Sequence, residues 1–289
     1  MHAIRRRTAI LLAAAGAMAS PAVAREAVRD GFFLTSDGVR LHYLEAGPAG
    51  ARTIILVPGW TMPAWIWGPQ IAAFAPYYHV IAFDPRGQGL SEVPARGYTP
   101  ERRAQDIAEL IARQRAPVLL VGWSLGVLDS LAYVHTHGDA ALAGLVLIDN
   151  SVGEAPAPVP AARPRRARRP VSHDVAMAGF VRSMFREPQS AAYLERLTDA
   201  TLQTPEWAAR ALLSYPVPRS YWREAIYSTA KPVLYVVRPG LAAQAGNLAR
   251  GRPNTETAVF TDAGHALFVD DAGRFDALMA AFIRQRVWP

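Results

Sequence analysis

The chain has 289 residues, of which 51% are hydrophobic and 19% charged, and it contains no cysteine. These proportions exclude a disordered chain, and the lack of cysteine excludes disulfides, a thiolate nucleophile and cysteine-ligated metal sites. The net charge of +7 comes from two arginine groups, at residues 5–7 and 163–169, because without their eight arginines 23 basic residues face 24 acidic ones, so no general nucleic-acid-binding surface is expected.

Residues 1–24 have the pattern of an export signal. Three arginines at residues 5–7 precede an apolar stretch over residues 9–19, and Ala22-Val23-Ala24 is a small-x-small cleavage site. The apolar stretch is shorter than the roughly 20 residues that a membrane-spanning helix needs. We therefore predict a mature chain that begins near Arg25, is exported to the periplasm or the medium, and has no integral membrane span.

Strands alternate with helices along the rest of the chain, with one interruption. Two alternating segments, residues 32–35 and 39–45, predict a hairpin, and six apolar runs are typical of buried strands: residues 53–57, 79–83, 117–121, 145–149, 233–237 and 257–260. Helical patterns lie between them at residues 66–74, 101–113, 125–135, 241–249 and 274–286. This alternation predicts an α/β fold with a doubly wound, mostly parallel sheet.

The alternation breaks between Asn150 and Lys231. A segment rich in proline and arginine is followed by three helical patterns, at residues 175–185, 191–202 and 206–213. We interpret residues 151–230 as a helical lid over the carboxyl edge of the sheet, inserted between two parts of one core, residues 25–150 and 231–289. The arginine run within it is interpreted as a solvated loop, with attraction to an acidic surface or an anionic substrate as the alternative.

The motif with the strongest chemical meaning is Gly122-Trp123-Ser124-Leu125-Gly126. It directly follows a predicted buried strand and directly precedes a helical pattern, which is the context of a nucleophile elbow. Glycines on both sides of Ser124 permit a very tight turn, so the serine hydroxyl would project above the sheet. The N-terminus of the following helix would point its N–H groups at the same place.

This pentapeptide and three further motifs resemble the α/β-hydrolase fold superfamily over nearly all of the mature chain. The segment 57–60 (Val-Pro-Gly-Trp) looks like the oxyanion loop of the superfamily, and residues 84–91 (Asp-Pro-Arg-Gly-Gln-Gly-Leu-Ser) look like its Asp-x-Arg-Gly-x-Gly-x-Ser loop. Gly264-His265 follows the last strand, where the superfamily carries its catalytic histidine. Pro58 and Gln88 replace the usual histidines, which puts loop geometry in question rather than chemistry.

The resemblance implies a role for each matching residue. Ser124 would be the nucleophile and His265 the general base, while the backbone N–H groups of Trp60 and Leu125 would form the oxyanion hole. The other six histidines lack the glycine-turn context of His265. No metal-ligating pattern and no nucleotide-binding glycine motif is present, so neither a metal nor a cofactor is expected.

The acid of the triad is missing from its usual place. No Asp or Glu occurs between Glu224 and Glu256, and the position that the superfamily pattern indicates falls near Leu241. Some members carry the acid at the end of the preceding core strand, which makes Asp149 the favoured candidate. Asp262 is the next candidate, and Asp270 is expected to cap the last helix.

The substrate is indicated only by the large apolar residues, mostly aromatic, of the two active-site loops. Trp123, Met62 and Trp65 are predicted to bind substrate, which favours an apolar ester. A serine nucleophile argues against a dehalogenase or an epoxide hydrolase, which use aspartate in this fold. The sequence therefore predicts an exported serine hydrolase, a carboxylesterase acting on small to medium apolar esters, and leaves its oligomeric state open.

Three alternatives remain open. An acyltransferase, lactonase, C–C bond hydrolase or cofactor-free haloperoxidase could use the same triad, because the fold does not determine the chemistry. A ligand-binding protein built on a degenerate hydrolase would explain the missing acid, although the intact Ser124 and His265 argue against it. A nucleic-acid- or surface-binding role for the arginine run is opposed by the neutral body of the protein.

Overall fold

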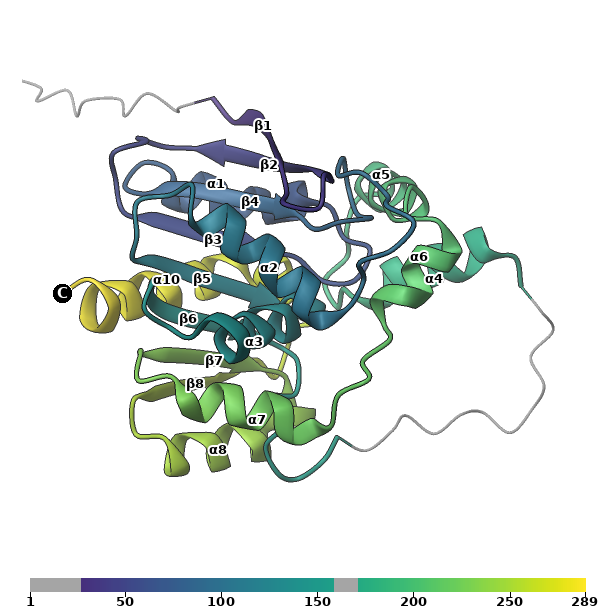
Figure 1. Ribbon diagram of the computed structural model, residues 1–289. Helices are drawn as coiled ribbons and strands as arrows, with labels where there is room; N and C mark the ends of the chain where they lie inside the picture. The colour runs from purple at the N-terminus through teal and green to yellow at the C-terminus, as the bar shows by residue number, and fades with distance from the viewer. Residues whose placement is uncertain (1–26, 159–170) are drawn as a thin grey trace, which may run out of the picture.

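The computed structural model describes residues 27–158 and 171–289 (Figure 1). The predicted export signal at residues 1–24 and the arginine run at residues 163–169 lie outside these residues.

A mostly parallel sheet forms the centre of the described part of the chain. Its eight strands follow the order β1-β2-β4-β3-β5-β6-β7-β8. β1 and β2 form an antiparallel hairpin, β2 is antiparallel to β4, and every later pair is parallel. The strand bounds are β1 Arg29–Leu34, β2 Arg40–Ala46, β3 Thr53–Val57, β4 His79–Asp84, β5 Val118–Trp123, β6 Leu142–Ile148, β7 Val233–Val237 and β8 Thr255–Val259.

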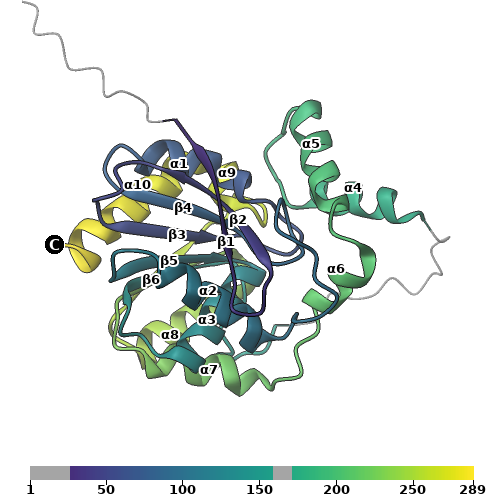
Figure 2. The ribbon, with the colours of Figure 1, turned by 45° about the horizontal axis from the view of Figure 1, so that its top comes forward.

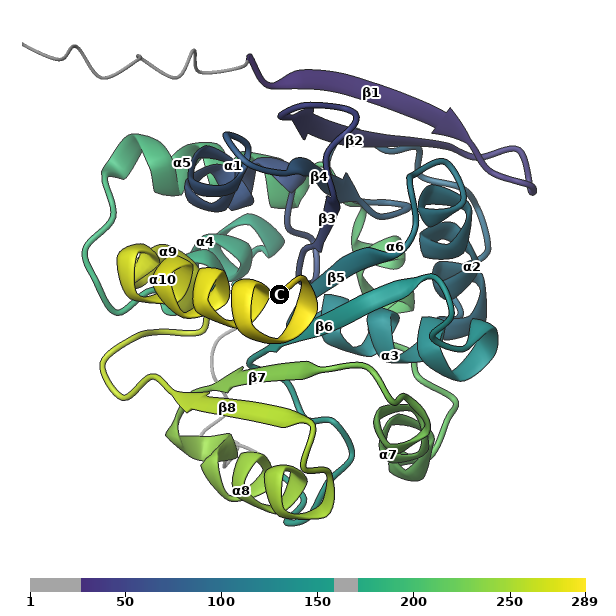
Figure 3. The same cartoon turned by 90° about the vertical axis from the view of Figure 1, so that its left-hand side faces the viewer.

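Helices cover both faces of this sheet, and Figure 3 shows α1 and α10 on one side of the strands with α2 and α3 on the other. The first face carries η1 (Ala64–Trp67), α1 (Gly68–Phe74), α9 (Leu267–Asp270), α10 (Ala272–Phe282) and η3 (Ile283–Val287). The second face carries α2 (Pro100–Ile111), α3 (Leu125–His137), α7 (Arg219–Ser228) and α8 (Ala242–Gly251), which η2 (Pro239–Leu241) precedes.

Alternation along the buried strands divides the core into two apolar layers. In β5, Leu119 and Val121 pack on the side of α1 and α10, whereas Val118 and Leu120 pack on the side of α2 and α3. Successive side chains of a strand point to opposite faces, so a continuous apolar run fills both layers. The predicted fold class, a doubly wound sheet with helices on both faces, is confirmed.

Local signals determine where several helices begin. The Thr99 hydroxyl accepts a hydrogen bond from the backbone N–H of Arg102 at 3.3 Å, and Pro100 occupies the first turn of α2. Ser172 and Ser190 cap α4 (His173–Ser183) and α5 (Ala191–Leu202) in the same way. These caps satisfy N–H groups that the first turn of a helix leaves free, which explains why the sequence located these starts closely.

The insertion between β6 and β7 contains α4, α5, α6 (Glu206–Leu212) and α7. Figures 1 and 2 show α4 and α5 beyond one end of the strands, away from both helical layers. α7 instead packs beside α3, where the ring centroids of Tyr221 and His135 are 3.9 Å apart. The division into a core and a lid over residues 151–230 stays a prediction, with α4–α6 as the part that lies apart from the sheet.

Candidate active site

Ser124 occupies a sharp turn between β5 and α3. Its backbone has φ 54° and ψ −115°, which few residues other than glycine adopt without strain. A Cβ on Gly122 would lie 2.3 Å from the carbonyl oxygen of Gly126, and one on Gly126 would lie 2.3 Å from that of Val57. Both glycines are therefore needed for the strand, the turn and the helix to pack this closely, as a nucleophile elbow requires.

His265 reaches Ser124 from the loop between β8 and α9. Its Nε2 is 2.8 Å from Ser124 Oγ, and its Nδ1 is 2.6 Å from Asp149 Oδ2. The Trp123 indole N–H donates to the carbonyl oxygen of His265 at 2.8 Å, which ties the loop to the elbow. With the proton on Nδ1, Nε2 is free to accept the serine proton, so the three residues form one continuous hydrogen-bonded chain.

Asp149 directly follows β6 and leaves the strand through a left-handed backbone conformation, with φ 50°. Its side chain is 1% exposed. Burial would raise the pKa of Asp149, but hydrogen bonds and charge from His265 and from Arg238 outweigh burial and hold that pKa below its usual value. The carboxylate is therefore ionised when it faces the imidazole.

Asp262, the other candidate acid, lies outside this chain of hydrogen bonds. Its side chain is 87% exposed, accepts a hydrogen bond from the Thr261 hydroxyl and is 3.8 Å from Arg186. Of the two candidates, the structure places only Asp149 against the histidine.

The two predicted oxyanion donors flank the serine. Leu125 is the first residue of α3, so its N–H lies at the positive end of the helix dipole. The loop that carries Trp60 passes against the elbow, since a Cβ on Gly59 would lie 3.1 Å from the Cβ of Ser124. Among the described residues, the backbone N–H of Trp60 has no acceptor. Both residues that carry the predicted oxyanion donors thus adjoin the serine, and their role as an oxyanion hole stays a prediction.

Gln88 holds the Trp60 loop in shape. Its side-chain oxygen accepts from the Thr61 N–H at 2.7 Å, and its side-chain nitrogen donates to the carbonyl oxygen of Gly59 at 3.2 Å. These bonds fix the residues on both sides of Trp60, and Thr61 is held with φ 58°. Gln88, at a position where the superfamily usually has histidine, thus holds the loop through two hydrogen bonds of its own.

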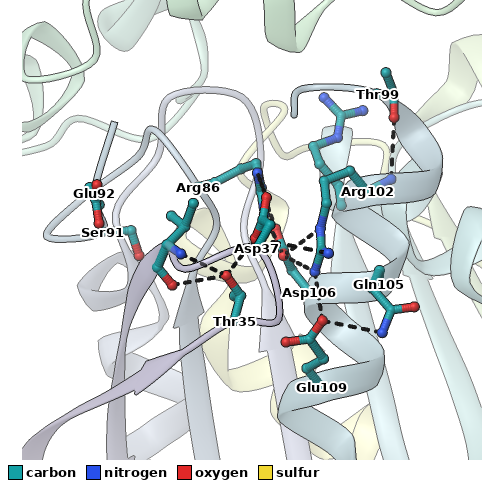
Figure 4. Close-up of polar contacts among 12 residues, drawn as sticks. Thr35, Asp37, Arg86, Ser91, Glu92, Thr99, Arg102, Gln105, Asp106 and Glu109 are labelled. Atoms are coloured by element: carbon teal, nitrogen blue, oxygen red, sulfur yellow. Dashed lines mark hydrogen bonds and ion pairs between the residues drawn. The ribbon is translucent and has the colours of Figure 1, made fainter. Parts of the chain in front are cut away.

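The loop 84–91 that carries Gln88 is itself anchored by a buried arginine, Arg86. Figure 4 shows Arg86 between Asp37, from the turn after β1, and Asp106 of α2. The Arg86 Nε donates to Asp106 at 2.6 Å and its Nη1 donates to Asp37 at 3.0 Å. The bond from Arg86 lowers the pKa of Asp37 to about 2. Because this arginine is fully buried, its two carboxylate partners determine where the loop lies.

The three predicted substrate-binding residues lie in different surroundings. Met62 and Trp123 are 0% and 1% exposed and belong to the apolar layer beneath the site. Trp65 is partly buried, stacks edge-on against Tyr193 of α5 and carries the guanidinium of Arg196 on its ring. Their role in binding stays a prediction.

A different apolar cluster adjoins Ser124 on the side of the insertion. Leu125 packs with Tyr98 and with Ala208 and Leu212 of α6, and Trp60 packs against this cluster. The Trp60 indole N–H donates to the carbonyl oxygen of Ala209 at 2.7 Å, so a helix of the insertion holds an oxyanion-loop residue. The sequence does not show this, because the contact joins residues 149 positions apart.

Asp270 has a role that the sequence did not indicate. Its Oδ2 accepts from the N–H of Gly264 at 2.6 Å and from that of Arg186 at 2.8 Å, which joins the histidine loop to the segment after α4. The expected capping of the last helix is wrong, since α10 begins after Asp271 without a side-chain cap. The carboxylate binds the preceding loop instead, where two N–H groups converge.

No group of three His, Cys, Asp or Glu side chains that could hold a metal ion occurs within residues 27–158 and 171–289. Over the same ranges, no helix is long and apolar enough to cross a bilayer.

Comparison with known proteins gives a consistent picture. The esterase RhEst1 from Rhodococcus sp. ECU1013 has a similar structure, with a TM-score of 0.73 and 26% identity over 90% of this chain and 99% of that one. Non-heme chloroperoxidase of Streptomyces lividans is 32% identical over 120 residues, which are 41% of this chain and 44% of that protein. Epoxide hydrolase A of Mycobacterium tuberculosis is 35% identical over 116 residues, which are 38% and 36% of the two chains.

These sequence alignments span less than half the length of the curated relatives. The model of the Alpha/beta hydrolase family, in contrast, matches residues 54–278, which is well over half of this chain. That range includes the elbow, the predicted acid, the histidine loop and the helical insertion. The resemblance seen in the sequence is confirmed, and the chain belongs to the alpha/beta hydrolase family.

Proposed function

We propose that this protein is a serine hydrolase that cleaves small to medium apolar carboxylic esters through an acyl-enzyme. The observation that carries the proposal is the unbroken chain of hydrogen bonds from Ser124 through His265 to Asp149, with contacts of 2.8 and 2.6 Å. A serine hydroxyl is a weak nucleophile until a neighbouring base removes its proton, and this chain supplies that base together with a carboxylate that orients it.

In the proposed reaction, Ser124 Oγ attacks the ester carbonyl carbon while its proton passes to Nε2 of His265. The negative charge that develops on the carbonyl oxygen is stabilised by the backbone N–H groups of Trp60 and Leu125. His265 then gives its proton to the departing alkoxide, which leaves as the alcohol. In the second half, His265 removes a proton from water, the resulting hydroxide cleaves the acyl-enzyme, and the proton returns to Ser124.

The preference for apolar esters is supported by the side chains next to the serine. Leu125, Leu212 and Ala208 form an apolar cluster beside the elbow, and Phe180 of α4 contacts the Trp60 ring at a centroid distance of 5.2 Å. Carbon-rich surroundings of this kind bind an acyl or alkyl group by removing it from water. A similar solved structure is that of an esterase, which agrees with this assignment.

A second candidate function is transfer of the acyl group from the same acyl-enzyme to an acceptor other than water. Relatives include a non-heme chloroperoxidase and a bifunctional esterase/perhydrolase of Acinetobacter calcoaceticus, 32% identical over 122 residues. Attack of hydrogen peroxide instead of water would convert the acyl-enzyme into a peracid. An acyltransferase would differ only in accepting an alcohol. The similarity to an epoxide hydrolase is not carried over, because a serine occupies the position of the nucleophile.

A series of p-nitrophenyl esters tests the proposal. We expect hydrolysis of the acetate, butyrate and octanoate, with kcat/KM falling for the dodecanoate, and no turnover by the Ser124→Ala variant. Release of free acid in water, compared with peracid in added peroxide and new ester in added alcohol, separates the candidates. A folded protein that hydrolyses none of these esters would contradict the proposal and favour a ligand-binding relative.

We also propose export of the protein, on the strength of the pattern in residues 1–24. Expression of the full chain in a Gram-negative host, followed by N-terminal sequencing of the periplasmic fraction, should give a mature chain that begins near Arg25. Retention of the intact chain in the cytoplasm would contradict export.

A further inference from the structure

Arg238 contacts both oxygens of the predicted triad acid, Asp149. It is the first residue after β7, and its backbone N–H donates to Asp149 Oδ1 at 3.0 Å. Its side-chain Nε donates to Asp149 Oδ2 at 2.6 Å, the same oxygen that faces His265 Nδ1. Its Nη2 is 3.5 Å from that Nδ1. One residue thus holds both oxygens of the carboxylate and reaches the imidazole.

We propose that Arg238 is a positioning residue for this active site, which holds the Asp149 carboxylate in the orientation that His265 needs. This inference rests on the proposed serine hydrolase function. It accounts for how an acid directly after β6 can orient the histidine, although the loop after β7 carries no carboxylate in this chain. In this chain the loop after β7 begins with Arg238, which binds the acid and does not replace it.

The surroundings explain why a holding residue is needed. A cavity of about 680 Å³ lies behind the acid, and Asp149 and Arg238 both line it, together with Arg186 and Thr261. The Asp149 side chain is 1% exposed, whereas that of Arg238 is 42% exposed. The guanidinium is therefore the solvent-exposed partner of a buried carboxylate, and both adjoin the same cavity. Without it, water could reach Oδ2 and compete with the imidazole for that oxygen.

The charge of Arg238 lies close to both the acid and the base of the proposed triad, since its Nε is 2.6 Å from Asp149 Oδ2 and its Nη2 is 3.5 Å from His265 Nδ1. Another ionisable group near the carboxylate is Tyr235 of β7, whose hydroxyl donates to the carbonyl oxygen of Asn150 at 2.7 Å and carries no charge at neutral pH. Within residues 27–158 and 171–289, Arg238 is the cation in contact with both Asp149 and His265.

The test compares Arg238→Met, Arg238→Lys and a matched control, Arg250→Met, with the parent protein. Arg250 is an exposed arginine of α8 whose side chain contacts Asn247. We expect Arg238→Met to lower kcat about tenfold to hundredfold, the effect of one hydrogen bond to a buried charge, with KM changed less than about twofold. Arg238→Lys should recover kcat only in part, because a single ammonium group cannot reproduce both side-chain contacts of the guanidinium.

A double-mutant cycle separates positioning from general stabilisation. Combined with Asp149→Asn, the change Arg238→Met should have little further effect, because the carboxylate on which it acts is gone. Equal fold losses in both backgrounds would overturn the proposal, as would a parent-like kcat in Arg238→Met.

A measurement without turnover keeps this inference separate from the proposed function. The Nδ1–H of His265, when bonded to a buried carboxylate, gives a proton resonance far downfield in NMR spectra. We expect this resonance in the parent and in Arg250→Met, and its broadening by exchange with water in Arg238→Met. An unchanged resonance in Arg238→Met overturns the positioning role, whereas a parent protein that shows the resonance but hydrolyses no ester overturns only the proposed function.

Discussion

The assignment of the acid leads to a sharp prediction for Asp149→Asn. Asparagine matches the shape of aspartate and tolerates the left-handed φ of 50° at this position, so the backbone should be unchanged. Its amide nitrogen cannot accept the hydrogen bond that Nδ1–H of His265 donates to the carboxylate. If the amide oxygen faces the histidine instead, the amide nitrogen faces the N–H of Arg238, and two donors then oppose each other. In either orientation of the amide, the imidazole of His265 loses the tautomer with the proton on Nδ1 or is held less well in place.

The magnitude follows from the geometry of the pair. For charge centres about 4 Å apart, the attraction between a carboxylate and a protonated imidazole is worth about 4 kcal/mol at an effective dielectric constant of about 20. Loss of the reactive tautomer adds to this, and removal of a triad acid lowers kcat by roughly 10⁴-fold, or about 5.5 kcal/mol. We therefore expect kcat to fall by roughly 10³- to 10⁴-fold in Asp149→Asn.

The assay is p-nitrophenyl butyrate hydrolysis under saturating substrate, with thermal melting as a check on the fold. Asp262→Asn is the matched control, because that carboxylate is 87% exposed and should leave kcat unchanged. The melting temperature of Asp149→Asn should stay close to that of the parent, since the partly exposed Arg238 can be hydrated when its partner is neutral. Unchanged turnover in Asp149→Asn, with a loss in Asp262→Asn, would refute the assignment.

Three further changes probe the structure around the site. Gln88→Leu removes both bonds that hold the Trp60 loop and should lower kcat about tenfold without unfolding the protein, as kinetics and circular dichroism will show. Gly126→Ala places a Cβ 2.3 Å from the Val57 carbonyl oxygen and should cost at least about 1–3 kcal/mol in urea unfolding, whereas Gly179→Ala, which meets open space, should not destabilise. The pKa of Asp37 is lowered from 3.8 to about 2 in the folded protein. The ionised carboxylate therefore contributes fully to the stability of the fold above pH 3.8, and this contribution is lost as the pH falls toward 2. Melting temperatures of the parent and of Asp37→Asn should therefore differ near neutral pH and converge at about pH 2; a constant difference would contradict this.

Features that depend on neighbouring residues could be predicted from the sequence. The bounds of β3, β7 and α5 agree with the expected residues 53–57, 233–237 and 191–202. Apolar runs and serine caps act within a few residues of themselves, so the linear chain contains the information. The elbow at Ser124 is of the same kind, because its glycines lie two residues away on either side.

Features that depend on distant contacts could be predicted only in part. The sequence favours Asp149 as the acid, with Asp262 as the next candidate, because the loop after β7 has no carboxylate. It also predicts that Asp149 lies within a strand over residues 145–149. The structure ends β6 at Ile148 and turns Asp149 out of the strand with φ 50°. The contacts of Arg238 with Asp149 and of Asp270 with Arg186 join residues 89 and 84 positions apart, and no local pattern reports them.

The predicted binding residues show why aromatic side chains are ambiguous. Trp123 lies beside the nucleophile in sequence, yet alternation along β5 turns its ring into the layer shared with α9 and α10, where it contacts Phe268 edge-on at a centroid distance of 5.0 Å.

The helix α7 is not among the elements that the sequence predicts. Prolines at residues 216 and 218 suggest a loop, whereas Tyr221, Trp222, Ala225 and Ile226 form an apolar face against α3.

The central claim is that Ser124 is an activated nucleophile, and the intact mass of the protein after reaction with a fluorophosphonate tests it most directly. The hydrogen-bonded chain from Ser124 to Asp149 predicts one adduct on the parent protein and none on Ser124→Ala, with labelling that slows sharply in Asp149→Asn. A folded parent protein that gains no mass, or equal labelling of Ser124→Ala, would contradict the claim.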